Sequence, residues 1–240
     1  VSFESGIPLM YPLTERVLEL TAASPRRALL NAVITDLPKT AHIEHVLSHL
    51  GDFTTLAKRN VSGEVLIDKT TYTVKDLEEL HAEVSSHIAE TVRWGFKKAT
   101  AVAPAEIGSP TNPIVKISSH ASFVDALINT RQSGLIGRRR PIKFFTINYD
   151  TLLEDALALG CHSYWDGFSG GALAFRNYRY GDADAGLGCR AHVIKLHGSI
   201  DWHLGVDGKV WRVRDRDLYP ERTGRVLIYP QAIKYVATQR

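Results

Sequence analysis

The chain has little cysteine, no long apolar run and no large excess of either charge. Its two cysteines, Cys161 and Cys189, form no C-x-x-C pair and cannot build a four-cysteine zinc ribbon, so we expect no metal. A single disulfide between them is open, but so low a count fits a reducing cytoplasm better. No run approaches the roughly 18 apolar residues that a membrane-spanning helix needs. We therefore expect a cytoplasmic protein without a membrane span.

The charge of the chain is mild. Lys and Arg number 29 against 26 Asp and Glu, which gives a net charge of +3. The main basic cluster, at 138–140, precedes a predicted strand and is more typical of a solvated loop than of a phosphate contact. Since a dedicated nucleic-acid binder gathers its basic residues on one face, we do not expect direct nucleic-acid binding.

The first half of the chain shows helical spacing almost throughout. Apolar residues recur every three or four positions in 41–60 and from about 74 to 97, and Thr14 is a candidate N-cap for a first helix. The second half alternates instead. A short apolar run at 142–147 predicts a buried strand, and a helix follows at once and ends at Gly160. The pattern predicts an α/β fold with a helical module placed early.

Two segments place polar residues where a strand ends. In FFTINYDTLLED a strand leads through Thr146, Asn148 and Asp150 into a helix, and HVIKLHGSIDW delivers His197 in the same way. Ligands of open parallel sheets bind at this edge. Each residue also has a simpler reading: Asp150 as a helix cap, Asn148 as a turn residue, and His197 as a satisfied loop histidine.

Three segments together resemble the sirtuins. TINYD at 146–150 resembles the family's T-Q-N-x-D segment, KLHGS at 195–199 resembles its histidine-glycine segment, and VSFESGIP at 1–8 resembles the tail of its G-A-G-x-S-x-x-S-G-I-P motif. They occur in family order. Three further segments, IEHVLSHL at 43–50, NYDTLLED at 148–155 and DGF at 166–168, look more like the sirtuin-like domains of bacterial antiphage defence systems than like protein deacylases.

The resemblance implies a Rossmann-like parallel sheet with helices on both faces and a helical insertion module. It implies three regions: 1–37 as the start of the nucleotide-binding domain, 38–120 as the helical module, and 121–240 as the remainder of the Rossmann-like domain. The family's Gly-Ala-Gly turn and first strand would precede Val1, and its last strands would follow Arg240.

The resemblance also implies that NAD is the substrate. Asn148, Asp150 and His197 are the expected catalytic residues, with His197 as general base because its ordinary pKa is near working pH. The expected NAD-binding residues are Ser2, Ser5, Gly6, Ile7, Thr146, Asn148, Asp150, Gly198 and Ser199. We expect hydrolysis of NAD to ADP-ribose and nicotinamide by the effector of an antiphage defence system.

The sequence departs from the deacylases of the family in three places. No cysteine follows His197, where they carry a four-cysteine zinc module, Leu9-Met10-Tyr11 replaces their Asp-Phe-Arg, and Ile147 replaces a glutamine. A protein deacylase or ADP-ribosyltransferase stays an alternative, as does a non-catalytic module that binds NAD or ADP-ribose. We expect a homo-oligomer, and a second defence protein, a HerA-type motor ATPase or an Argonaute-like protein, as partner.

Overall fold

The structure of the chain is a computed structural model that describes residues 2–130, 141–177, 188–213 and 224–227. The basic cluster at 138–140 lies outside these residues. By their contacts, the described residues form two compact units: 7–113 make up one, and 2–6 together with the residues from 114 onward make up the other. The domain boundaries given by the resemblance stay predictions.

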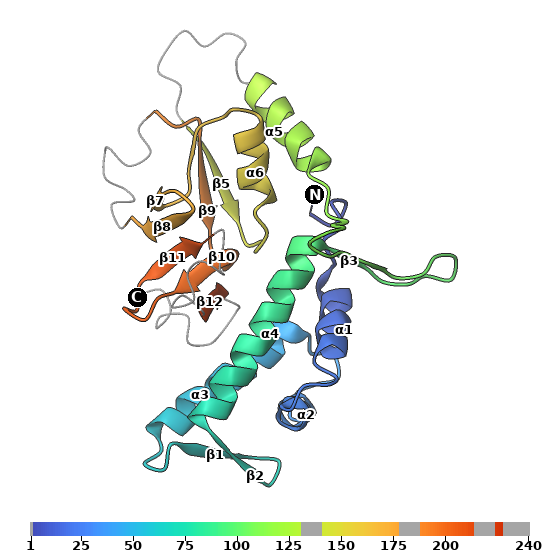
Figure 1. Ribbon diagram of the computed structural model, residues 1–240, viewed down its shortest axis with the longest axis vertical. Coiled ribbons are helices and arrows are strands. Elements are labelled where there is room, and N and C mark those ends of the chain that lie inside the picture. The colour runs from blue at the N-terminus through green and yellow to red at the C-terminus, as the bar shows by residue number, and fades with distance from the viewer. Residues whose placement is uncertain (1, 131–140, 178–187, 214–223, 228–240) are drawn as a thin grey trace. The chain divides into compact units, whose positions relative to one another are not determined.

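The unit of residues 7–113 is mainly helical (Figure 1). Its elements are α1 (Met10–Leu20), α2 (Arg27–Thr35), α3 (Ile43–Arg59), β1 (Glu64–Ile67), β2 (Thr70–Thr73), α4 (Val74–Trp94), β3 (Phe96–Lys97) and β4 (Glu106–Ile107). The helices predicted in 41–60 and from about 74 correspond to α3 and α4. The antiparallel hairpins β1–β2 and β3–β4 were not predicted.

Thr14 does not begin a helix. It lies inside α1, where its hydroxyl donates to the Met10 carbonyl at 2.8 Å and accepts from the Ile43 amide at 2.9 Å. Ile43 is the first residue of α3. The prediction of an N-cap was therefore wrong for α1, although the same hydroxyl satisfies one of the free amides at the start of another helix.

Local chemistry fixes both ends of α4. The Thr73 hydroxyl accepts from the Asp76 amide at 3.2 Å, and the Asp76 carboxylate accepts from the Thr73 amide at 2.9 Å, which is a capping box. The helix ends at Gly95, whose φ of +89° suits glycine. The predicted continuation to residue 97 fails there, because residues 96 and 97 form β3.

The other unit is built on strands. Its elements are α5 (Ser118–Thr130), β5 (Ile142–Thr146), α6 (Leu152–Leu159), β6 (Tyr164–Trp165), β7 (Phe168–Gly170), β8 (Leu173–Arg176), β9 (Ala191–Lys195), β10 (Gly198–Leu204), β11 (Val210–Val213) and β12 (Gly224–Leu227). The strand predicted at 142–147 and the helix ending at Gly160 are β5 and α6. The chain is an α/β protein with a parallel sheet, as expected.

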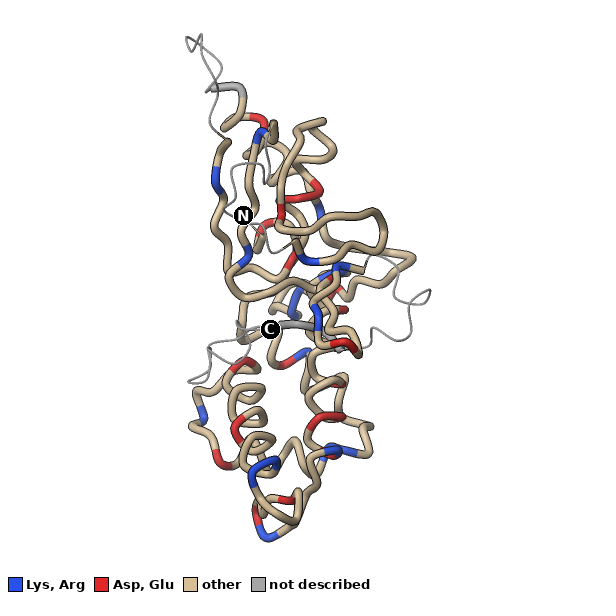
Figure 2. The backbone as a smooth tube through the Cα atoms, turned by 90° about the vertical axis from the view of Figure 1, so that its left-hand side faces the viewer, with Lys and Arg blue, Asp and Glu red and all other residues tan. Residues whose placement is uncertain are grey.

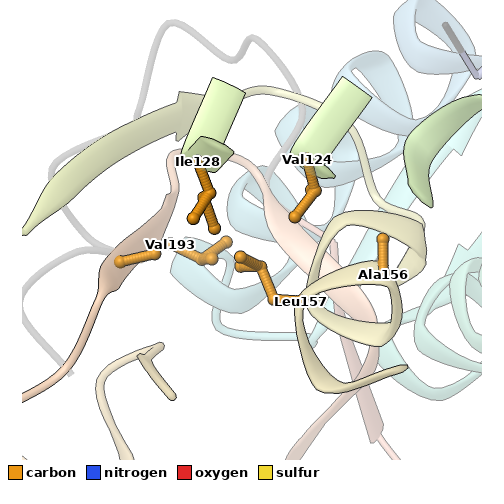
Figure 3. Packing of buried hydrophobic residues seen from close by; sticks show 6 residues of the cluster. Val124, Ile128, Ala156, Leu157 and Val193 are labelled. Carbon is orange, nitrogen blue, oxygen red and sulfur yellow. The ribbon is translucent and has the colours of Figure 1, made fainter. Parts of the chain in front are cut away.

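The parallel sheet has the strand order β5-β9-β6. α5 and α6 pack against one face of it. Figure 3 shows Val124 and Ile128 from α5 and Leu157 from α6 meeting Val193 of β9. On the opposite face Phe145 is 65% exposed, and no helix described for this unit covers it. In the described residues, this unit therefore carries its helices on one face.

A second sheet was not predicted as a unit. Its five strands are antiparallel in the order β12-β10-β11-β8-β7. β10 begins at Gly198, directly after His197, so the chain passes from the parallel sheet through the candidate site into this second sheet. Phe168, Ala174, Trp202 and Val210 form its buried cluster.

Charges of both signs are interspersed along the described chain (Figure 2). None of the described helices is both long and apolar enough to serve as a membrane span.

Candidate functional site

Two strand ends lie side by side at one edge of the parallel sheet. β5 and β9 pair in parallel with Thr146 opposite Lys195, so residues 147–151 and 196–197 leave the sheet at the same level. Two backbone hydrogen bonds then join these segments: the Leu196 amide donates to the Thr146 carbonyl and the Ile200 amide to the Tyr149 carbonyl, each at 2.9 Å. We call residues 147–151 the polar turn and residues 196–197 the histidine bend.

Ser2 connects the two polar side chains of the polar turn. The Asn148 amide nitrogen donates to the Ser2 hydroxyl at 2.9 Å, and this hydroxyl donates to Asp150 Oδ2 at 2.9 Å. Asp150 is buried, while Asn148 is exposed. Segment 1–8 and segment 146–150 of the resemblance, although more than 140 residues apart in the sequence, are therefore joined by one chain of hydrogen bonds.

Asp150 also serves the helix that follows it. Its other oxygen, Oδ1, accepts from the Leu152 amide at the start of α6 at 3.0 Å. The capping role weighed for this residue from the sequence is thus present. It occupies one carboxylate oxygen and leaves the second for Ser2, and a negative group is favourable at this end of a helix.

Ser5 and Gly6 lie in the short segment that precedes the helical unit. Ser5 is buried and its hydroxyl shares a hydrogen bond of 3.1 Å with His120 Nδ1. Gly6 has a φ of +92°, and a Cβ there would lie 2.9 Å from the Ile114 carbonyl oxygen, so both backbone and space require glycine. Ile7 is the first residue of the helical unit, and its role in NAD binding stays a prediction.

His120 was not predicted from the sequence. It lies in the first turn of α5 and is 6% exposed. In the sequence nothing sets it apart from the other histidines of the helical segments. Burial lowers the pKa of its imidazole, and the charge of Asp150 opposes that shift. The neutral form is therefore favoured, which suits an imidazole that exchanges one hydrogen bond with a hydroxyl.

The remaining predicted residues build the two loops. The Thr146 hydroxyl accepts from the Asn148 amide at 3.0 Å, and the buried Ser199 hydroxyl donates to the Tyr149 carbonyl at 3.2 Å. Gly198 has a φ of +82°, which lets the chain turn from the histidine bend into β10. These three residues therefore shape the backbone of the site.

His197 is half-buried in the histidine bend. Within the described residues, no hydrogen bond joins its imidazole to Asn148 or Asp150. The structure brings its backbone to the edge where the polar turn lies, and its role as general base stays a prediction.

A buried ion pair lies beneath the polar turn and was also missed. Lys195 Nζ lies 3.1 Å from Glu154 Oε1, with side chains 2% and 10% exposed. Burial raises the pKa of Glu154 to about 7; Lys195 opposes this rise, and Asp201 adds to it. In the sequence, only the position of Glu154 among the apolar residues of its helix could have indicated that this carboxyl is buried.

The described residues show no metal site. In these parts of the chain no group of three or more His, Cys, Asp or Glu could hold a metal ion. Cys161 and Cys189 are both free thiols, so the disulfide left open by the sequence is not formed. That the protein carries no zinc stays a prediction.

A model of a known protein family matches part of the chain. Residues 142–238 match the family model described as SIR2-like domain, which is less than half of the chain. No curated protein matches. The match covers the polar turn and the histidine bend and supports the sirtuin-like domain that the three segments indicate. A SIR2-like domain indicates chemistry that involves NAD.

Proposed function

We propose that the chain hydrolyses NAD to ADP-ribose and nicotinamide. One observation carries this proposal: the paired ends of β5 and β9 bring Asn148, Asp150 and His197 to one edge of a parallel sheet, and Ser2 is hydrogen bonded to the first two. Amide, carboxylate and imidazole groups at such an edge suit the ribose of a nucleotide.

The reaction breaks the bond between ribose C1′ and the pyridinium nitrogen. The nitrogen keeps the electron pair, so nicotinamide leaves as a neutral molecule and the sugar becomes positively charged in the transition state. The carboxylate of Asp150 stabilises this charge in a buried setting, where an electrostatic interaction is stronger than in water. A water oxygen then bonds to C1′ and its proton passes to His197.

Asn148 and Ser2 position the groups that react. The Asn148 side chain is exposed and already fixed at one end by Ser2, so its remaining polar atom is available to a ribose hydroxyl or to the attacking water. We assign Ser5 and Gly6 to the phosphate side of NAD, as the resemblance to the sirtuins implies.

The test is incubation of the purified protein with NAD, with and without an acylated peptide. We expect ADP-ribose and nicotinamide in both reactions. His197→Ala and Asn148→Ala should lower the rate by about 10²–10⁴, the usual contribution of a positioned proton-transfer group. His162→Ala, which removes a histidine of the loop after α6, is the matched control and should hydrolyse NAD like the unchanged protein.

Other outcomes would point to other functions. Turnover that requires the peptide would indicate a deacylase, and labelled protein an ADP-ribosyltransferase. Binding without turnover would indicate a nucleotide-binding module. Unchanged turnover in a folded His197→Ala variant would exclude the role given to this histidine.

We also propose that the enzyme is the effector of a bacterial antiphage defence system in the cytoplasm. An unrestrained hydrolase would drain the NAD of its own cell, so activity has to depend on a second conformation or on access to the site. Assembly as a homo-oligomer, or binding to a HerA-type ATPase or an Argonaute-like protein, would supply this restraint. Expression of the protein alone should leave cellular NAD intact, and immediate depletion by a monomer would contradict the proposal.

A further inference from the structure

One buried side chain contacts the polar turn and the start of β10, the strand that follows the histidine bend. Lys195 is the last residue of β9, two positions before His197. Its ammonium group donates to the Asp150 carbonyl, to the Tyr149 carbonyl at 3.4 Å and to the Ser199 hydroxyl at 2.7 Å. The polar turn and the start of β10 are therefore held by the same ammonium group.

Ser199 extends this contact. Its hydroxyl accepts from Lys195 and donates to the Tyr149 carbonyl at 3.2 Å, and the Ile200 amide donates to that same carbonyl at 2.9 Å. The Tyr149 carbonyl thus receives three donors from the two segments around the histidine bend. Such a network holds one backbone geometry, because loss of any member leaves a buried polar group unsatisfied.

The charge of Lys195 is balanced from a third element. Glu154 of α6 supplies the carboxylate, and both side chains are nearly inaccessible to water. A buried ion pair of this kind is weak support for stability, because removing two charges from water costs about as much as their attraction returns. Its presence at this place calls for another role.

We propose that Lys195 is a positioning residue that fixes the polar turn, with Asn148 and Asp150, against the histidine bend. Its contacts on the turn are to backbone carbonyls, so it sets the path of the chain without occupying the side chains of Asn148 and Asp150. The effect of Lys195 on catalysis rests on the proposed function, whereas its effect on the geometry of the polar turn does not.

The test removes the ion pair as a unit. Lys195→Met together with Glu154→Gln takes away the donors without leaving an uncompensated buried charge, so this double variant should fold even where Lys195→Met alone does not. The matched control is Arg212→Met with Asp166→Asn. This pair is similarly buried, at 13% and 12% exposure of the side chains, and none of its hydrogen bonds in the described residues reaches the polar turn.

Hydrogen exchange at two backbone amides measures how firmly the polar turn is held, and it needs no substrate. The Ile200 amide donates to the Tyr149 carbonyl and the Leu152 amide to Asp150 Oδ1. We expect native-state hydrogen exchange at both amides to be at least about tenfold faster in the double variant and unchanged in the control, since local opening exposes amides whose acceptors move. Unchanged exchange in the double variant would overturn the proposal.

The second measurement is steady-state hydrolysis of NAD. A displacement of about 1 Å at reacting groups can cost about 100-fold. We expect kcat of the double variant to fall by about that factor and KM to change less than tenfold, with both constants preserved in the control. Faster exchange with an unaltered kcat would overturn the positioning role. If the unchanged protein does not hydrolyse NAD, the proposed function fails, and the exchange measurement still decides what Lys195 does.

Discussion

Glu154→Gln tests whether the buried carboxyl beneath the polar turn makes folding dependent on pH. Glu154 is 7% exposed, and burial raises the pKa of its carboxyl from 4.5 to about 7. Lys195 and Asp201 are the charged groups that face it, and both stay in the variant. The substitution removes the titration and keeps nearly the same shape.

The sign of the effect follows from the direction of the shift. A carboxyl whose pKa is raised by folding holds its proton more tightly in the folded state. The folded state is therefore favoured below pH 4.5, and this advantage is lost as the pH rises from 4.5 to about 7. A pKa difference of one corresponds to 1.36 kcal/mol, so ionisation of Glu154 costs about 3 kcal/mol of the free energy of unfolding.

The assay is chemical denaturation of both proteins at pH 5 and pH 8. Between these values the free energy of unfolding of Glu154→Gln, relative to the unchanged protein, should rise by about 2–3 kcal/mol, because the variant lacks the ionisation cost. That change is a large part of the usual 5–15 kcal/mol. Tryptophan fluorescence is a suitable signal, since Trp165, Trp202 and Trp211 lie in the unit that holds Glu154.

Asp125→Asn is the control. Asp125 is an exposed carboxyl on α5 of the same unit. Asp125→Asn therefore removes a negative charge from the surface and leaves the buried carboxyl of Glu154 in place. A relative free energy of unfolding of Glu154→Gln that is equal at pH 5 and pH 8 would refute the reasoning. It would mean that Glu154 ionises as freely as it does in the unfolded chain.

Three further substitutions and a metal analysis have expected results. Ser2→Ala removes the hydroxyl that joins Asn148 to Asp150, and we expect kcat/KM for NAD to fall about tenfold, since hydrogen bonds to charged groups contribute about 1.5–3 kcal/mol; an unaltered kcat/KM would contradict this. Gly6→Ala should lower the free energy of unfolding by about 1–3 kcal/mol because of its positive φ. Gly171→Ala, where an added Cβ meets nothing within 4 Å, should leave stability nearly unchanged in the same denaturation assay. Metal analysis of the purified protein should find no stoichiometric zinc, and one zinc per chain would revive the deacylase alternative.

The sequence indicated the elements whose pattern is local. The apolar run that became β5 and the helix that became α6 follow from neighbouring residues, as does the helical spacing of α3 and α4. The hairpin β1–β2 was missed because its two-residue turn consists of Asp68 and Lys69, with φ of +42° and +66°. Such a turn is normally signalled by glycine or asparagine, and neither is present here.

The site was predictable only where its residues follow the strand ends directly. Thr146, Asn148, Asp150 and His197 could be placed at one edge because parallel strands end on the same side. His120 and Lys195 could not. Their importance comes from contacts with Ser5 across 115 residues and with the Asp150 carbonyl across 45 residues, and no local spacing reports such contacts.

Asp150 shows why a structural reading and a functional reading of one residue need not compete. From the sequence, a helix cap would have been a sufficient explanation for its carboxylate. In the structure the cap uses Oδ1, and Oδ2 accepts from Ser2. The bond to the Leu152 amide fixes the rotation of the carboxylate, and Lys195 fixes the carbonyl of the same residue. The oxygen on the Ser2 side is therefore held in place before any substrate binds. For a group that has to stabilise a transient positive charge, such prior orientation is what makes it effective.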